Sequence, residues 1–161
     1  MPSPSIEPFP DQSELCFRPA QAGDAPAIRA LLEAAYAIYV PRMGRLPVTM
    51  DGDFAAAVRD DLIWVVTDGA GLLAVLHLRL RPDHLFIEDV AVRPDRQRQG
   101  IGKRLLAFSE EEGRQRGHRE IRLFTNATMV ENAGLYAGLG YREYHREPVR
   151  GTDVIYMRKA L

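Results

Sequence analysis

Hydrophobic residues along the chain recur either at helical spacing or in short continuous runs. Helical spacing predicts helices over residues 25–39 and 101–116, a short helix ending at residue 59, and a last one over Val130–Gly138. Short runs rich in β-branched and aromatic residues predict strands over residues 15–19, 62–67, 72–80, 86–92, 120–125, 141–145 and 153–158. The strand over 120–125 follows a crossover helix, so it should lie parallel to the strand over 86–92.

The strand over residues 86–92 leads into a basic turn that opens the helix at Ile101. Gly100 and Gly102 have no Cβ, so the backbone amides at this helix start can approach a ligand closely. Unpaired amides and the helix dipole favour an anion, and a pyrophosphate suits the site. Four cations lie nearby: Arg93, Arg96, Arg98 and Lys103.

Three alternatives to this interpretation of the turn exist: two known phosphate-binding loops, and a helix start with no ligand. A dinucleotide-binding loop needs a third small residue where Leu105 stands. A Walker A loop needs serine or threonine where Arg104 stands. The letters fit neither loop, and the other explanation is a helix start that merely tolerates glycine.

Composition indicates an ordinary globular protein. Its 161 residues fit one domain, expected over residues 14–161 after a Pro/Ser-rich, flexible tail over residues 1–13. A net charge of −1 gives no general attraction to nucleic acid or to an anionic membrane. The chain has a single cysteine, which excludes an internal disulfide, and no apolar run long enough to cross a bilayer, so we expect a cytoplasmic protein.

The helix over Val130–Gly138 carries a second informative pair. Asn132 and Tyr136 are four residues apart and therefore share one helix face. Taken alone, Tyr136 also fits a core aromatic residue with its hydroxyl at the rim.

The two stretches together, Gln97-x-x-Gly100-x-Gly102 and Asn132-x-x-x-Tyr136, resemble the GNAT superfamily of N-acetyltransferases. The resemblance implies an α/β fold of the α+β type, with a mixed central sheet of about six to seven strands and about four helices. It implies acetyl-coenzyme A as the cofactor and a small-molecule, amino-acid, peptide or protein amine as the acceptor. A homodimer is left open. The cofactor-binding residues implied by position are Val90, Ala91, Val92, Gln97, Arg98, Gln99, Gly100, Ile101, Gly102, Lys103, Asn132 and Tyr136.

Acetyl transfer to an amine needs a base, because an alkyl amine with a pKa near 10.4 is mostly protonated at neutral pH. Glu88 resembles the acidic residue that some family members carry on this strand; a partner for an arginine or for substrate charge is the alternative. On a regular strand Asp89 would face the opposite side, although a β-bulge could change this. Tyr136 is the candidate acid for the departing thiolate, and the Val90 amide the candidate oxyanion donor.

The acceptor cleft is expected under the segment between the first two helices, which carries Tyr36, Tyr39, Arg42, Arg45 and Met50. Core tyrosines beside a solvated basic loop fit these letters equally well. The substrate-binding residues predicted from this segment and from two strands are Tyr36, Tyr39, Arg42, Glu88, Thr125 and Asn126.

The sequence favours direct attack of the amine over a covalent intermediate. Cys16 lies far upstream, and Ser109 has no nucleophile-elbow motif around it. The four histidines are scattered without metal-ligand spacing, so we expect no metal. Two alternatives stay open: a catalytically silent coenzyme A-binding regulatory module, and a phosphate-loop nucleotide binder.

Overall fold

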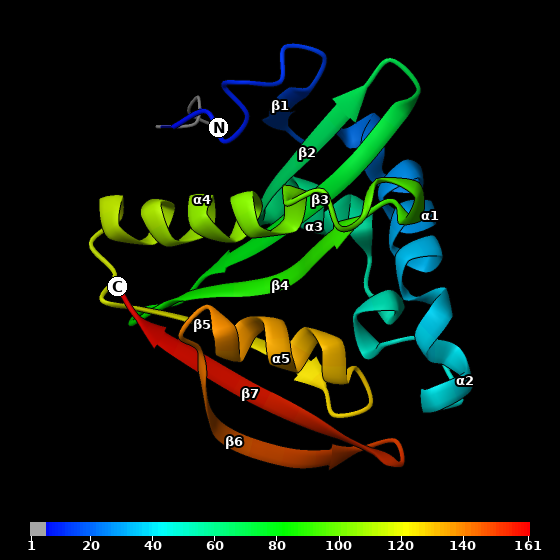
Figure 1. Ribbon diagram of the computed structural model, residues 1–161, viewed down its shortest axis with the longest axis vertical. Coiled ribbons are helices and arrows are strands. Elements are labelled where there is room, and N and C mark those ends of the chain that lie inside the picture. Colours follow the sequence, from blue (N-terminus) through cyan, green and yellow to red (C-terminus); the bar gives the residue numbers. More distant parts are fainter. Residues whose placement is uncertain (1–5) are drawn as a thin grey trace.

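The computed structural model describes residues 6–161 and shows one seven-stranded mixed sheet with helices on both faces (Figure 1). Its strand order is β1-β2-β3-β4-β5-β7-β6. The strands are β1 Cys16–Pro19, β2 Leu62–Asp68, β3 Gly71–Leu80, β4 Leu85–Val92, β5 Glu120–Asn126, β6 Arg142–Val149 and β7 Thr152–Ala160. The α-helices are α1 Ala25–Tyr36, α2 Val40–Met43, α3 Phe54–Asp60, α4 Ile101–Gln115 and α5 Val130–Gly138. The predicted α/β fold class is confirmed.

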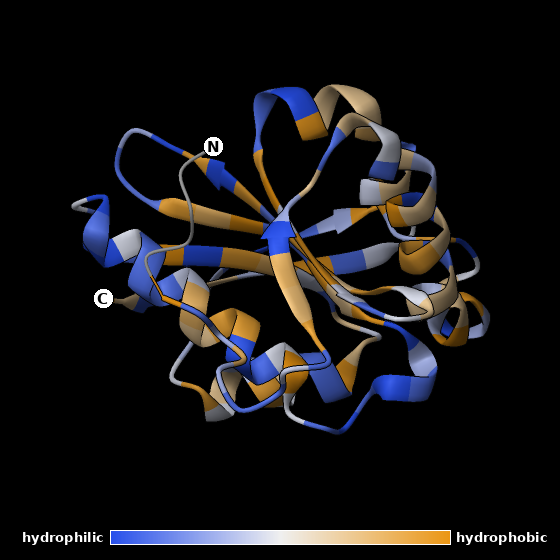
Figure 2. Cartoon of the chain, turned by 90° about the horizontal axis from the view of Figure 1, so that it is seen from above, coloured by the Kyte–Doolittle hydropathy of each residue, from blue (hydrophilic) through white to orange (hydrophobic). Residues whose placement is uncertain are grey.

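Two hydrophobic cores hold the layers together, one on each face of the sheet. On one face, Leu105 and Leu106 of α4 pack with residues such as Trp64 and Leu76 on the strands. On the other face, Leu32 of α1 belongs to the core that also contains strand residues of the same sheet. Figure 2, seen from above, shows helices on both sides of the sheet and long apolar stretches on its strands.

Two predicted elements differ from the structure near prolines. The first helix was expected to run to residue 39, but α1 ends at Tyr36 and a 3-10 turn, Ala37–Tyr39, joins it to α2. Pro41 lies in the first turn of α2, where its missing N–H costs nothing. Strand β6 runs to Val149, beyond the predicted end at residue 145. The prediction stopped early because the mostly exposed residues of this strand carry no apolar pattern, and Pro148 is tolerated because β6 is an edge strand.

The predicted flexible tail over residues 1–13 is only partly described, and residues 1–5 lie outside the described residues. Phe9 is buried and belongs to the core, where its ring lies edge-on to that of Phe17. Arg104 of α4 donates hydrogen bonds to Asp11. The segment around Phe9 therefore packs on the domain. The sequence did not indicate this, because Phe9 is a single aromatic residue among polar ones.

Strands β4 and β5 are parallel, as predicted, but they pair only from Leu85↔Ile121 to Ile87↔Leu123. Beyond these residues both strands continue, β4 to Val92 and β5 to Asn126, with no further pairing between them. The sheet therefore opens between the carboxyl ends of its two parallel strands, which is where open α/β sheets bind ligands.

A β-bulge lies at the point where the two strands part. His77 of β3 pairs with Asp89, and its neighbour Leu78 pairs with Ile87, so Glu88 is the extra residue. Ile87 packs in the core under α4, whereas Ala91 packs in the core under α1. The bulge changes the alternation of side chains along β4, and both Glu88 and Asp89 line the same pocket.

Candidate active site

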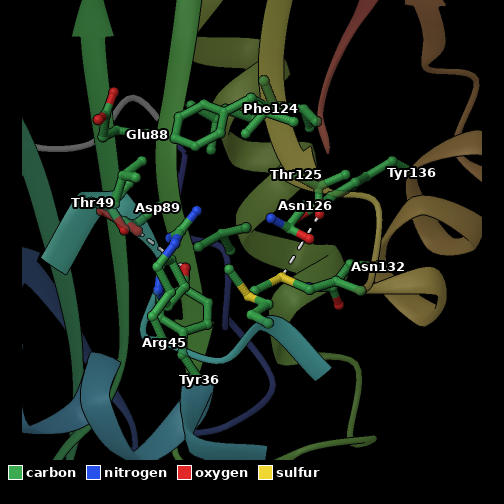
Figure 3. A pocket seen from close by; sticks show the side chains of 18 residues that line it. Tyr36, Arg45, Thr49, Glu88, Asp89, Phe124, Thr125, Asn126, Asn132 and Tyr136 are labelled. Carbon is green, nitrogen blue, oxygen red and sulfur yellow. Dashed lines mark hydrogen bonds between the residues drawn. The ribbon is translucent and has the colours of Figure 1, made fainter. Parts of the chain in front are cut away.

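The pocket lies at the opening between β4 and β5 and encloses about 600 Å³, part of it open to solvent. In Figure 3, Glu88, Asp89 and Tyr36 lie on one side of it, and Thr125, Asn126, Asn132 and Tyr136 on the other. The pocket is lined by residues 87–90 of β4, residues 123–126 of β5, Tyr36, Met43, Arg45, residues 47–49, Met129, Asn132, Tyr136 and Val154.

Beyond Ile87, the main chain of β4 has no strand partner on the side that faces this opening. The amide of Arg93 donates to the carbonyl oxygen of Leu73 on the β3 side at 2.8 Å. Because backbone groups alternate along an antiparallel strand, Val92 and Val90 direct theirs to the opposite edge, toward β5. The Val92 carbonyl accepts a hydrogen bond from Nε2 of Gln97 at 3.0 Å.

Ala91 was predicted as a cofactor contact together with its two neighbours, and the structure places it differently. Its main chain faces Val75 of β3, and its side chain is buried in the core under α1. Ala91 therefore has no polar group at the open edge of β4, since successive residues of a strand face opposite ways.

The glycine turn lies at the start of α4, as the sequence indicated. Gly100 is the N-cap residue and has φ +82°, a left-handed conformation that glycine adopts without strain. Gly102 lies inside the helix, and a Cβ there would meet only Val92 Cγ2 at 3.9 Å, an ordinary contact. The packing of the chain does not require a glycine at position 102, so its open space is available to a ligand next to the first-turn amides.

The cations around the turn divide into two groups. Arg93 and Arg96 both bind the carboxylate of Asp68, at 3.0 and 3.1 Å. Arg98 and Lys103 are exposed and form no ion pair or side-chain hydrogen bond within residues 6–161. Two of the four cations are therefore available to an anion.

The other predicted turn residues can offer a ligand mainly their backbone amides. Gln99 is exposed and accepts a hydrogen bond from Nε of Arg96 at 3.1 Å. The side chain of Ile101 is buried in the core, so only its amide can face a ligand. The amides of Ile101, Gly102 and Lys103 belong to the first helical turn and have no acceptor within the helix.

Tyr136 lies inside the pocket and is only 8% exposed. Its hydroxyl forms no hydrogen bond with any residue that the structure describes. Burial, and next the charge of Asp89, raise the pKa of Tyr136 far above its ordinary value. The phenol is therefore protonated throughout the physiological pH range. Asn132, one turn earlier on α5, contacts Met129 Sδ with its Nδ2 at 3.7 Å and also lines the pocket.

Two carboxylates face the pocket from β4. Burial raises the pKa of Glu88, and Arg79, whose Nη1 lies 3.7 Å from Glu88 Oε2, acts against that rise. Asp89 is only 3% exposed and accepts a hydrogen bond from the Tyr36 hydroxyl at 3.0 Å. The predicted contact residue Tyr36 therefore lines the pocket and holds Asp89 in position.

A row of polar residues behind Asp89 was missed from the sequence. His77 is buried on β3 and shares a hydrogen bond with Asp61, Nε2 to Oδ2, at 2.8 Å. Asp61 Oδ2 also accepts from Nε of Arg79 at 3.1 Å. The one available signal was a histidine inside the apolar run of β3, since a buried histidine needs polar partners.

Two predicted acceptor residues lie outside this pocket. Arg42 binds Glu131 of α5 at 2.8 Å and the Thr128 carbonyl oxygen at 3.2 Å. Tyr39 is buried with Met43 and Met129 beneath that ion pair. Both residues join the α2 region to α5, an arrangement that a loop sequence alone does not reveal.

Thr125 and Asn126 line the pocket, but Asn126 is mostly occupied by the chain itself. Its Oδ1 accepts from the amide and the hydroxyl of Thr128, and its Nδ2 donates to Thr152 at 2.7 Å. The side chain of Asn126 therefore fixes the loop that carries α5. Thr125 donates to Met129 Sδ at 3.9 Å.

The segment after α2 adds two polar atoms to the pocket lining. Arg45 donates to the carbonyl oxygens of Leu46 and Val149, while its buried Nε has no partner within the described residues. The buried hydroxyl of Thr49 likewise has no partner there. Both residues line the pocket.

Residues 6–161 contain no cluster of three or more histidine, cysteine, aspartate or glutamate side chains arranged to hold a metal ion. Over the same residues, every helix is too short or too polar to cross a membrane.

The model of the acetyltransferase (GNAT) family matches residues 27–141, which include β4, the glycine turn and α5. The chain belongs to this GNAT family. The match agrees with the resemblance carried by Gly100, Gly102, Asn132 and Tyr136. A comparison with curated protein sequences gives no significant match.

Solved structures of GNAT proteins share the fold. The ribosomal-protein-S18-alanine N-acetyltransferase from Escherichia coli has a TM-score of 0.75 and 24% identity, covering 91% of this chain and 93% of its own. The PaiA N-acetyltransferase from Thermoplasma acidophilum, solved with coenzyme A, has a TM-score of 0.76 and 15% identity, covering 91% and 99%. A GNAT acetyltransferase from Elizabethkingia anophelis, solved with acetyl-coenzyme A, has a TM-score of 0.70 and 17% identity, covering 92% and 99%.

Proposed function

We propose that this chain is an N-acetyltransferase that transfers the acetyl group of acetyl-coenzyme A to an amine. One observation carries the proposal: the free main-chain edge of β4 runs from the glycine turn to a pocket lined by Glu88 and Asp89. A donor lying along this edge brings its reactive end to the two carboxylates, where a protonated amine is attracted.

The residues at the turn fit the pyrophosphate of acetyl-coenzyme A. The first-turn amides of α4 and the free cations Arg98 and Lys103 supply positive charge. The room beside Gly102 allows close approach. The main-chain groups of Val90 and the amide of Val92 are available to the pantetheine arm, with Asn132 and Tyr136 across the opening.

Acetyl-coenzyme A supplies an activated thioester, and the chain positions it and handles the protons. The Val90 amide at the open edge of β4 is the donor for the developing oxyanion. Tyr136, kept protonated by burial, donates to the departing sulfur. Glu88 faces the amine and either takes its proton or holds its positive charge.

We infer direct attack of the amine on the donor. Cys16 is exposed on the edge strand β1, far from the residues that line the pocket. With no nucleophilic cysteine or serine among those lining residues, the reaction has no covalent step on the protein. The acceptor class remains a small-molecule, amino-acid, peptide or protein amine.

The proposal is tested by following thiol release from acetyl-coenzyme A across a panel of amines, amino acids and peptides. The expected result is release that depends on one acceptor class and stops when the acceptor is omitted. Isothermal titration with coenzyme A is run in parallel. Tight binding without thiol release for any acceptor would identify a silent coenzyme A-binding module, and binding of a nucleoside triphosphate that coenzyme A does not displace would identify a nucleotide binder.

A further inference from the structure

Two buried polar atoms without partners face each other behind the pocket. His77 Nδ1 and Asp89 Oδ2 are 3.6 Å apart, and neither forms a hydrogen bond with any described residue. The distance is too long for a hydrogen bond. Buried polar atoms are almost always paired, so two such atoms facing each other call for an explanation.

The hydrogen-bond partners of His77 and Asp89 indicate that a proton is missing between the two side chains. Asp61 Oδ2 lies 2.8 Å from His77 Nε2, so the neutral imidazole carries its proton on Nε2 and leaves a lone pair on Nδ1. Asp89 Oδ1 accepts from the Tyr36 hydroxyl, and Oδ2 is a bare acceptor. A lone pair therefore faces a carboxylate oxygen, and one added proton satisfies both atoms.

We propose that the Asp89–His77 pair receives the proton that the acceptor's ammonium group must lose, which leaves Glu88 to hold the ammonium charge. This inference rests on the proposed acetyltransferase function. An ammonium nitrogen loses two protons when it becomes an amide, and the departing sulfur takes one. The other proton leaves the nitrogen at Asp89, whose carboxylate passes it to His77 Nδ1, where the new N–H bond forms. The nitrogen keeps the electron pair of the broken N–H bond and attacks with it.

The position of the pair between two pockets gives this proton an exit. Asp89 lines the substrate pocket, and both Asp89 and His77 line a second pocket, whose polar lining also includes Asp53 and Thr49. Asp61, with a side chain 22% exposed, lies on the other side of the imidazole. His77 can therefore take a proton from the substrate side through Asp89 and release it on the side of the second pocket.

The charges that face His77 come from several elements. Burial lowers the pKa of His77, but the carboxylates of Asp89 and Asp61 more than offset this, so the pKa lies above the ordinary value of 6.5. Glu88 on β4, Asp53 before α3 and Arg79 on β3 are the other charged groups around the second pocket. The imidazolium is thus held between two carboxylates, which suits a group that stores a proton during turnover.

The first test is the pH dependence of thiol release with His77→Gln. Only deprotonated His77 can accept the proton, so wild-type kcat/KM should rise with pH through a pKa above 6.5. His77→Gln should lose that step, with kcat about 100-fold lower at pH 7, and should approach the wild type near pH 10, where free amine is abundant. A ratio of variant to wild type that stays constant from pH 6 to about 10 would overturn the proposal.

Asp61→Asn separates this role from a structural one. Removing that carboxylate leaves His77 in place but lowers its pKa, so the rise in kcat/KM should move to lower pH with the maximal rate retained. His145→Gln, on an exposed histidine of β6, is the control and should leave the profile unchanged. An unmoved profile in Asp61→Asn would contradict the proposal.

NMR titration of the imidazole of His77 gives a readout that needs no activity. The wild-type protein should show a pKa above 6.5 for His77, and Asp61→Asn a lower one. If His77 titrates below 6.5, or not at all, the proposal that it accepts the proton is wrong, even if the enzyme is active. Absence of thiol release with every amine, together with a raised His77 pKa, would instead overturn the acetyltransferase function.

Discussion

The proposed binding site has two ends that are built in different ways: a donor end at β4 and the glycine turn, and an acceptor end at the pocket. The donor end is one continuous stretch, β4 followed by the glycine turn and the start of α4, and its ligand-facing groups are mainly backbone amides. The acceptor end brings together side chains from α1, the segment after α2, β3 and β4. A donor site of amides tolerates side-chain change, whereas an acceptor site of side chains can change specificity without disturbing the donor.

The strongest way to break the donor end is Gly100→Glu. The substitution forces a residue with a Cβ into φ +82° and places an anion at the helix amides, so coenzyme A affinity should fall at least about 100-fold. Isothermal titration measures it. Gly117→Glu is the matched control, because Gly117 has φ +81° at the other end of α4 and open space around it. Unchanged coenzyme A affinity in Gly100→Glu would contradict the assignment of the glycine turn as the anion site.

Tyr136→Phe should affect the chemical step and leave the donor bound. Loss of the buried phenol should lower kcat about 100-fold, with coenzyme A affinity nearly unchanged. Tyr141→Phe is the control: its ring centroid lies 6.0 Å from that of Tyr136, it is also buried, and it lies outside the pocket lining. Full activity of Tyr136→Phe would exclude Tyr136 as the acid.

Glu88→Gln tests the acceptor end with a smaller expected effect. If Glu88 holds the ammonium charge, its loss should raise the acceptor KM about tenfold and leave kcat and its pH profile intact. Steady-state kinetics at several pH values measure this. A fall in kcat that high pH restores would make Glu88 the base in place of the Asp89–His77 pair.

Arg42→Ala should have the smallest effect. Arg42 binds exposed Glu131 away from the pocket, and such pairs contribute little, so the acceptor KM should stay within about twofold of the wild type. Glu131→Ala removes the same pair from the other side and should behave alike. A large rise in KM for Arg42→Ala alone would show that the acceptor reaches beyond the pocket.

The same contrast explains how much the sequence could predict. The glycine turn and the start of α4 at Ile101 were located to the residue, because glycine spacing and a helix start are local signals. The parallel pair followed from the crossover helix between its two strands, as the pairing of Leu85 with Ile121 confirms. The end of β6 could not be located, since that strand is mostly exposed and carries no apolar alternation.

The acceptor side depends on contacts between residues far apart in the chain. The bulge at Glu88 shows in the pairing of β3 with β4 and has no local signature. Asp61 and His77 meet 16 residues apart in the chain, and Tyr36 and Asp89 meet 53 apart. Arg42 was assigned to the acceptor by its place in the loop, whereas its hydrogen bond to Glu131, 89 residues away, and its position outside the pocket lining have no signal in the sequence.

The central claim is that the donor lies along the open edge of β4, and amide NMR during a coenzyme A titration tests it most directly. The account predicts that the amide signals of Val90, Val92, Ile101, Gly102 and Lys103 shift together with one dissociation constant. The Gly100→Glu protein should show none of these shifts. Binding that leaves these five signals in place and shifts others would contradict it.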